Sequence, residues 1–474
     1  MRRPFFCTFA ARMSQVRIQK NTAELKSQEL GEKSIGKLMW KYFLPAFVGV
    51  VVYSLYNIVD RIFIGRGVGS LALSGLSTVF PIMLIVMAFG MLIGVGAGVN
   101  VSIAMGQKKP ERAQQFLGNG LVLMIILSIG VTIIGFLVKT PILELFGATE
   151  KTISYAHDYL NIILLGTIFQ IIGFGMNNII RSEGNARISM YSMLLSAGAN
   201  LILDPIFIFV LDLGVKGAAY ATIISMIGLN VWVISHFISG RAVNRLKLKF
   251  MKLKREIIGK IFAVGMAPFS MQLAASFVIG LFTSQLITHG GDLAVGALGI
   301  IFSIVNFLVM AMVAINMASQ PIIGYNFGAK DYGRVKKTVR YGIIAATVVA
   351  VVSTLIVEVF PEPLVRLFNT DDPELFSIAV NGMRIFSLAL PVVGFQIVAA
   401  NFFQSIGKAK VATFLSLLRQ LILLAPLLII LPGRFGLDGV WMASPISDFG
   451  SALITGFFLF WQMKKLGSEE IPES

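Results

Sequence analysis

Two acidic residues lie inside long apolar runs of the sequence, and the first of them is Asp60 in SLYNIVDRIFIG. Tyr56 and Asn57 precede it by four and three residues, so in a helix the three side chains share one face. A carboxylate in the middle of a membrane helix costs about 2.5–3.5 kcal/mol, and such residues usually serve function. The alternative is that Asp60 lies near a helix end and only pairs with Arg61 or Arg66.

The second acidic residue is Asp204, in the run ANLILDPIFIF, with Asn200 one turn earlier on the same helix face. Pro205 follows directly and cannot donate a helical hydrogen bond, so it frees a carbonyl about one turn earlier. A carboxylate, an amide and a free carbonyl form an oxygen-rich site that suits a proton or a hard monovalent cation. The alternative is a protonated carboxylic acid that is kept for packing alone.

The depth of these residues in their helices predicts one shared site. Asp60 and Asp204 lie about five and seven residues from the outer ends of their apolar runs, and Thr222 lies about five residues into the next run. At about 1.5 Å per residue these positions differ by only a few Å in height. Two carboxylates that face each other in a low dielectric cannot both ionise cheaply. We therefore expect Asp60, Asn200, Asp204 and Thr222 to form a site that binds H⁺ or Na⁺.

Four further residues are expected to support this site. Tyr56 and Asn57 share the helix face of Asp60, and Pro45 and Pro205 are expected to bend their helices. The second half of the chain offers Arg384 and Arg419, which are expected to be buried cations inside apolar runs, and Asp448 without an obvious partner. Their roles stay open, since interior hydrogen bonding and snorkelling to the interface are equally good explanations. Glu183 is expected to make a structural ion pair in a loop.

The composition shows which elements must position these residues. Of 474 residues, 56% are hydrophobic and 14% are charged, and the mean hydropathy is +0.81. A soluble domain carries roughly 25% charged residues, so much of this surface must face lipid. We predict an all-α integral membrane protein with twelve transmembrane helices at roughly 38–64, 75–105, 117–138, 158–180, 188–210, 217–239, 258–287, 294–323, 339–360, 378–403, 411–431 and 437–462.

The distribution of basic residues predicts the orientation. The net charge is +16, and 31 Lys and Arg residues fall in the two tails and in alternate loops, against 7 in the opposite loops. By the positive-inside rule both termini are cytoplasmic, in a multi-pass protein of the bacterial plasma membrane. The one cysteine, Cys7, and three scattered histidines predict neither an internal disulfide nor a metal site.

The two halves of the chain repeat each other. GSLALSGLSTVF (69–80) matches GDLAVGALGIIF (291–302), and RSEGNA (181–186) matches QSIGKA (404–409), so the offset between the halves is nearly constant. Each half contains six predicted helices, so both halves share one orientation, as in parallel-repeat transporters. We predict a cytoplasmic tail, an N-terminal six-helix lobe, a basic cytoplasmic linker, a C-terminal six-helix lobe and a second cytoplasmic tail over residues 1–37, 38–240, 241–257, 258–463 and 464–474.

Several of these segments resemble the multidrug and toxic compound extrusion (MATE) family, and most of all its MepA-like bacterial branch. The resemblance runs from about residue 36 to 464 and is carried by YNIVDRIFIG (56–65), VFPIMLIVMAFGMLIGVGAG (79–98), IRSEGNAR (180–187), LDPIFIF (203–209) and GVKGAAYAT (214–222). It implies two six-helix lobes that form a V around a central cavity, and it implies antiport of drugs against H⁺ or Na⁺.

The same resemblance implies a cation site in the N-terminal lobe. Family members of this type use an aspartate on the first helix, an Asn-x-x-x-Asp pair on the fifth and a threonine on the sixth. These match Asp60, Asn200 with Asp204, and Thr222. Another branch places a glutamate in the seventh helix, where this sequence has Ser276, so a coupling site in the C-terminal lobe is not expected.

The sequence contains no Walker A, HExxH or GxSxG pattern in a suitable setting, so we predict a transporter driven by an ion gradient and no enzyme. We expect it to act as a monomer in the lipid bilayer, to export bulky lipophilic and mostly cationic drugs, and to bind no nucleotide, nucleic acid or cofactor. The alternative within the same superfamily is a flippase for lipid-linked oligosaccharides. A membrane acyl- or glycosyltransferase would need more than the single adjacent pair His157–Asp158.

The predicted orientation can be tested by labelling in intact cells. Single cysteines at Lys254 and Glu362, in a Cys7→Ser background, should react with impermeant maleimides from opposite faces of the membrane. Lys254 lies in the predicted cytoplasmic linker and Glu362 on the predicted outer side. Labelling of both positions from outside would contradict this topology.

Overall fold

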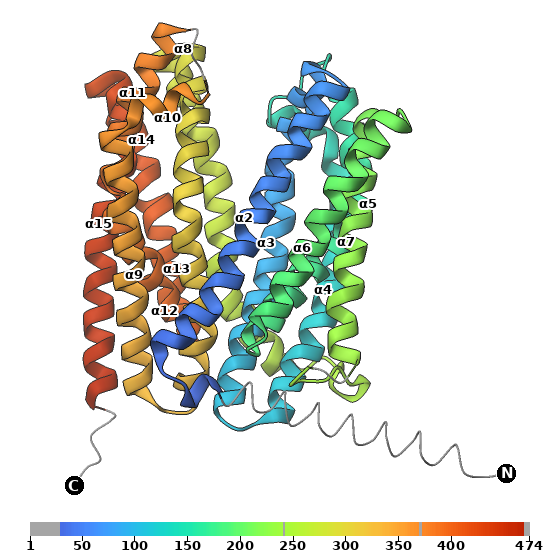
Figure 1. Cartoon of the computed structure of the whole chain (residues 1–474), viewed down its shortest axis with the longest axis vertical. Coiled ribbons are helices and arrows are strands. Elements are labelled where there is room, and N and C mark those ends of the chain that lie inside the picture. Colours follow the sequence, from blue (N-terminus) through green and yellow to red (C-terminus); the bar gives the residue numbers. More distant parts are fainter. Residues whose placement is uncertain (1–28, 240–241, 369–371, 469–474) are drawn as a thin grey trace, which may run out of the picture. The chain divides into compact units, whose positions relative to one another are not determined.

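The computed structural model describes residues 29–239, 242–368 and 372–468, and every regular element there is helical (Figure 1). The elements of the first half are α2 (Ile35–Gly67), α3 (Ser70–Gly106), α4 (Pro110–Leu145), α5 (Ile153–Ser182), α6 (Ala186–Pro205), the π-helix η1 (Ile206–Val210), α7 (Gly214–Ile238) and the 3₁₀ turn η2 (Leu248–Phe250). Those of the second half are α8 (Arg255–Gly328), α9 (Tyr332–Val359), α10 (Pro361–Arg366), α11 (Pro373–Ser387), α12 (Leu390–Ser405), α13 (Ala409–Leu417), the π-helix η3 (Leu418–Leu424), α14 (Ala425–Ile430) and α15 (Pro432–Ser468).

Within the described residues, ten helices are long and apolar enough to cross a membrane, counting α6 with η1 and the stretch Ala409–Ile430 as one each. The pair α11 and α12, bent by 48°, is together long and apolar enough for one further crossing. Gly291 interrupts α8 with a left-handed backbone (φ 65°), so its 74 residues are two helices. The described chain therefore accommodates twelve crossings, in agreement with the predicted all-helical membrane fold.

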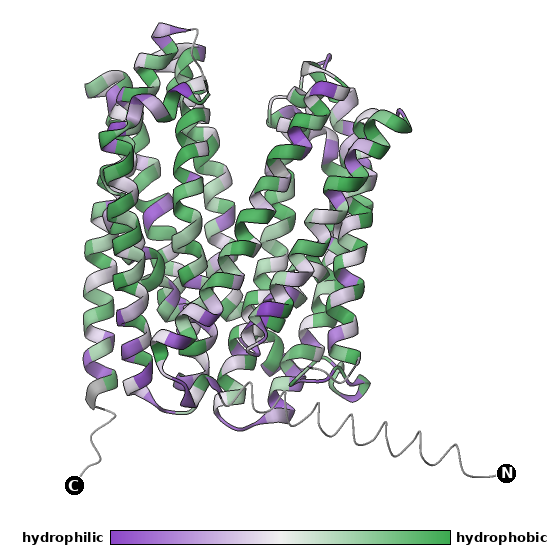
Figure 2. Ribbon diagram, viewed as in Figure 1, coloured by the Kyte–Doolittle hydropathy of each residue, from purple (hydrophilic) through white to green (hydrophobic). Residues whose placement is uncertain are grey.

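The side chains on the outside of these helices are apolar. Figure 2 shows hydrophobic residues along the middle of the helices and hydrophilic ones gathered toward their ends. Leu137 on α4 is 77% exposed and Phe460 on α15 is 73% exposed. Large apolar surfaces of this kind mark contact with lipid or with another protein.

The chain divides into two compact units, and each is described by itself. Unit 1 contains the described residues up to Ser34, Val52–Gly265 and Gly324–Lys330. Unit 2 contains Ile35–Val51, Met266–Ile323 and the described residues from Asp331 on. Helices α2 and α8 thus contribute residues to both units.

The backbone repeats with the spacing of the sequence repeat. Left-handed φ angles occur in pairs that are separated by the same nearly constant offset, and they mark equivalent turns in the two halves. The pairs are Gly69 with Gly291, Lys108 with Lys330, Gly184 with Gly407, and Gly214 with Gly436.

Close packing of α3 on α5 forms the centre of unit 1. A Cβ atom on Gly94 would lie 2.5 Å from the Cα atom of Gly175, so only glycine allows the two backbones this approach. One turn later, a Cβ atom on Gly98 would lie 2.5 Å from the Oγ atom of Ser182. Small residues at four-residue spacing are a common device for packing membrane helices.

This packing predicts the effect of a single methyl group. Gly94→Ala should lower the stability of the purified protein by about 1–3 kcal/mol, because the helices must separate to relieve the overlap. The matched control is Gly130→Ala on α4, where nothing lies within 4 Å of an added Cβ atom. A melting temperature of Gly94→Ala in detergent that equals that of the control would show that α3 and α5 do not meet here.

Candidate functional site: an acid pair beside a cavity

The acid pair lies in unit 1, where α2 carries Asp60 and the last turn of α6 carries Asp204. The two carboxyl groups are within hydrogen-bonding reach of each other when one of them carries a proton. Asp204 is only 1% exposed. The Oδ1 atom of Asp60 and the Oδ2 atom of Asp204 are buried and have no hydrogen-bond donor among the described residues.

An amide connects this pair to the next helix. Asn200 Nδ2 donates a hydrogen bond to Asp204 Oδ1 (3.1 Å) and lies 3.5 Å from Thr222 Oγ1 on α7. Asn200 and Thr222 are both buried. The Oδ1 atom of Asn200 is a third buried oxygen without a donor in the described part of the chain. Three acceptor oxygens without donors, in one buried place, fit a proton or a hard monovalent cation.

Tyr159 on α5 completes the site, and the sequence analysis did not identify it. Its side chain is 3% exposed and lies close to Thr222, Asp60 and Asp204. Tyr159 lies six residues into α5, at a depth comparable to that of Asp60 near the other end of α2. A tyrosine at this depth in an apolar run is the signal that could have identified it.

The local structure explains how α6 presents its carboxylate. Pro205 ends the α-helical hydrogen-bond pattern because it has no N–H group, and the π-helix η1 continues the chain. π-helical turns inside membrane helices often accompany functional sites. Pro45 lies inside α2 as well, in the part of that helix that belongs to unit 2.

The structure thus brings together Asp60, Asn200, Asp204 and Thr222, and their role in coupling stays a prediction. Tyr56 lies near Asp60 and contacts Tyr53 edge to face, with ring centroids 5.1 Å apart. The side chain of Asn57 lies outside the described residues. The alternative of a simple surface ion pair is not supported, because Asp60 forms no ion pair within the described chain.

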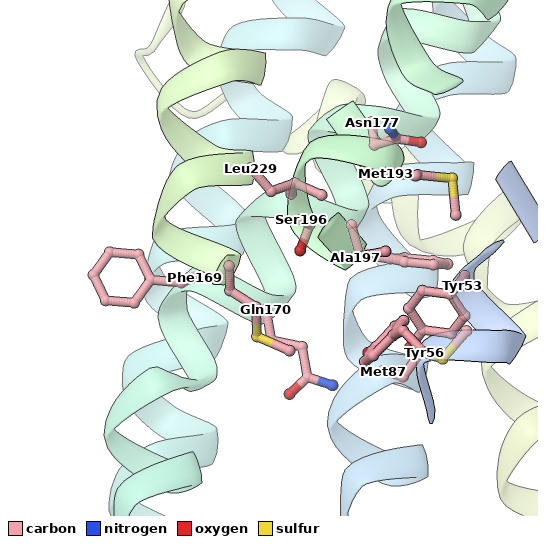
Figure 3. A pocket seen from close by; sticks show the side chains of 12 residues that line it. Tyr53, Tyr56, Met87, Phe169, Gln170, Asn177, Met193, Ser196, Ala197 and Leu229 are labelled. Atoms are coloured by element: carbon pink, nitrogen blue, oxygen red, sulfur yellow. The ribbon is translucent and has the colours of Figure 1, made fainter. Parts of the chain in front are cut away.

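A cavity of about 60 Å³ lies beside this site in unit 1 (Figure 3). Its wall is formed by aromatic, methionine and a few polar side chains, and Tyr56 is shared with the acid pair. Successive turns of α6 connect the two places, because Met193 and Ala197 line the cavity and Asn200 and Asp204 follow on the same helix face. The full lining is Tyr53, Tyr56, Met87, Phe169, Gln170, Phe174, Asn177, Met193, Ser196, Ala197, Met226 and Leu229.

Two expectations about other charged residues need correction, and a third is met by an unexpected partner. Asp448 has a partner, since Arg419 Nε donates to its Oδ1 atom at 2.5 Å within unit 2. Arg384 on α11 is exposed and not buried. The structural pair expected of Glu183 is present, but the partner of this fully buried residue is His236 (2.8 Å), which lies 53 positions away and is connected to it by no local pattern.

Comparison with known proteins gives consistent matches. The family model MatE matches residues 45–206 and 268–430. The multidrug export protein MepA of Staphylococcus aureus (strain MSSA476) is 31% identical over 423 residues, which are 89% of this chain and 93% of the relative. The MepA protein of Staphylococcus haemolyticus is 30% identical over 429 residues, or 90% and 94%.

Solved structures share the fold. A MOP superfamily transporter from Pyrococcus furiosus superposes with a TM-score of 0.88 at 24% identity, over 93% of this chain and 98% of that one. An outward-facing multidrug resistance MATE family transporter gives a TM-score of 0.88 at 24% identity, over 92% and 98%.

Proposed function

We propose, from the premise that the chain belongs to the MatE family, that it is a secondary active multidrug antiporter of the bacterial plasma membrane. It exports bulky, lipophilic and mostly cationic compounds in exchange for H⁺ or Na⁺. The observation that carries this proposal is the pair of half-buried Asp60 and buried Asp204, with three buried acceptor oxygens that no donor of the described chain satisfies. The names of the staphylococcal relatives, multidrug export proteins, support the transport of drugs.

Neutralisation of the acid pair is the first step of the mechanism. A proton or Na⁺ that enters between Asp60 and Asp204 removes the repulsion of two buried negative charges. Asn200 fixes one oxygen of Asp204 through its amide, and Thr222 and Tyr159 position the opposite side of the site. The cation therefore changes the interaction of α2 with α6, and it does so at the wall of the neighbouring cavity.

The exchange of drug for cation follows from the contact between the acid pair and the cavity wall. Tyr56 belongs to the cavity wall and also lies near Asp60, so its position depends on the state of the pair. Met87, Met193 and Met226 have flexible side chains that can move to admit a larger aromatic compound than the present 60 Å³ would hold. A cation that favours the drug-free arrangement must leave before drug binds again, which is reciprocal coupling between two sites.

Neutral substitutions test the role of the acid pair. Asp60→Asn and Asp204→Asn should each reduce gradient-driven efflux of a cationic dye from proteoliposomes by about tenfold or more, because the site can no longer gain and lose a charge. Imposing ΔpH or ΔNa⁺ alone identifies the coupling ion. The variants should remain folded, because asparagine keeps the shape and hydrogen-bonding capacity of the side chain.

Arg384→Gln, which changes one exposed charge in unit 2, is the control and should transport normally. Near-normal efflux in both aspartate variants at matched reconstitution would exclude the coupling site. If the wild-type protein moves no dye with either gradient and translocates a lipid-linked oligosaccharide, the flippase alternative is correct.

A larger side chain in the cavity wall tests its role in drug binding. Ala197→Leu adds three carbon atoms to the wall and should weaken dye binding about tenfold or more, with little effect on cation binding at the acid pair. Gly198→Ala on the same helix is the control, since nothing lies within 4 Å of an added Cβ atom there. Equal dye affinity in both variants, measured by fluorescence anisotropy, would show that drugs bind elsewhere.

A further inference from the structure

A second and larger cavity, of about 220 Å³, lies at one end of unit 1. It is bounded by the end of α3, the start of α4 and the second turn of α8. Its wall contains three cationic side chains, Lys109, Arg112 and Lys260, with the amides of Asn100 and Gln107 and the ring of Phe116. Neither the acid pair nor the proposed transport cycle uses this cavity.

The cationic charge of the cavity exceeds the acidic charge beside it. Glu256 is the shared partner of two cations, at 2.5 Å from Arg112 and 3.0 Å from Lys260. The ammonium group of Lys109 has no partner within the described residues. Glu111, in the first turn of α4, lies 3.7 Å from Lys249, which is not part of the wall. The wall itself therefore has three cations and no carboxylate, and its net positive charge attracts an anion.

The repeat supplies an internal comparison for Lys109. Its equivalent in the second half is Asp331, because Asp331 follows Lys330 as Lys109 follows Lys108. Lys109 is the N-cap of α4, and Asp331 is the N-cap of α9. The backbone angles are similar, with φ −110° and ψ 74° at Lys109 and φ −86° and ψ 77° at Asp331. The carboxylate of Asp331 accepts a hydrogen bond from the backbone N–H of Arg334 (3.0 Å), whereas Lys109 provides no side-chain cap for α4.

The second half thus supplies its own anion at this turn, and the first half places a cation there beside a cavity. A bound anion would occupy the place of the Asp331 carboxylate: it would accept from the first-turn N–H groups of α4 and from the three cations. The geometry and charge of the first half are those of a site for an external phosphate group.

The position of the cavity favours a lipid headgroup as the source of such a phosphate group. Residues 107–109 lie between the two membrane-capable helices Leu71–Gly106 and Pro110–Leu145, at the level where a crossing ends. Lipid headgroups lie at this level, and basic pockets between membrane helices bind anionic headgroups. Phe116 lies further along α4 than Lys109 and Arg112 and adds an apolar ring to the wall.

We propose that this cavity binds the headgroup phosphate of an anionic lipid, which stabilises the turn between α3 and α4 and its packing on α8. Free inorganic phosphate offers the same chemistry without the acyl chains, so the two sources can be separated. The site would make the transporter sensitive to the anionic lipid content of its membrane.

The test uses the purified full-length protein in a non-ionic detergent. Phosphatidylglycerol should raise the melting temperature by about 2–4 °C at saturation, with retention of at least one lipid in native mass spectrometry, and phosphatidylcholine should not. Lys109→Asp gives α4 the N-cap residue that its equivalent position in the second half, Asp331, has. It should weaken phosphatidylglycerol binding about tenfold or more and still melt no lower than wild type without lipid, because aspartate caps α4 itself.

Lys410→Asp is the matched control, since it reverses one exposed charge in the first turn of α13, which belongs to unit 2 and is not part of the cavity wall. Lys260→Gln is the second cavity variant and should also weaken phosphatidylglycerol binding. The proposal is wrong if Lys109→Asp and Lys260→Gln bind phosphatidylglycerol like wild type, or if Lys410→Asp loses binding to the same extent. If millimolar inorganic phosphate stabilises the protein and phosphatidylglycerol does not, the occupant of the cavity is not a lipid and the proposal is wrong.

Discussion

Two carboxyl groups that face each other away from water need a proton or a cation between them, and the first unit depends on this constraint. Asp60 and Asp204 come from helices that are far apart in the sequence, so their approach couples the positions of α2 and α6. The surrounding groups satisfy only part of the hydrogen-bonding capacity: Asn200 donates one bond to Asp204, and three oxygens remain without donors in the described chain. A site that is completed only by an exchangeable cation is suited to coupling, and a site for packing alone would be saturated by the protein itself.

The two halves share a backbone plan and differ in chemistry. Equivalent turns recur at a nearly constant offset, yet the position of Asp60 corresponds to Phe282 in the second half. Asp448 in unit 2 corresponds to Met226, which lines the cavity of unit 1, and it is held by Arg419. At the N-cap that follows Lys108 and Lys330, the first half has Lys109 and the second half has Asp331. Duplication therefore explains the architecture, and later divergence placed an acid pair in one half and an ion pair in the other.

The membrane fold and the acid pair could be predicted because their signals are local. Apolar runs of about 20 residues indicate spans, and Asn200, Asp204 and Pro205 lie close together on one helix. Tyr159, the Arg419–Asp448 pair and the partner of Glu183, His236, were missed because each depends on which helices pack together. Arg384 was expected to be buried because it lies in an apolar run, but the exposed face of α11 carries it. The cavities required side-chain positions from several helices and had no signal in the sequence.

The central claim is that occupation of the acid pair and binding of drug are linked, and equilibrium binding measures this link without transport. A cationic dye is titrated into purified protein over a range of pH at fixed Na⁺, and over a range of Na⁺ at fixed pH. The account predicts that dye affinity falls as the concentration of the coupling ion rises in the wild-type protein. It also predicts that Asp204→Asn removes this dependence. Dye affinity that responds to H⁺ or Na⁺ equally in the wild-type protein and in Asp204→Asn would contradict the account.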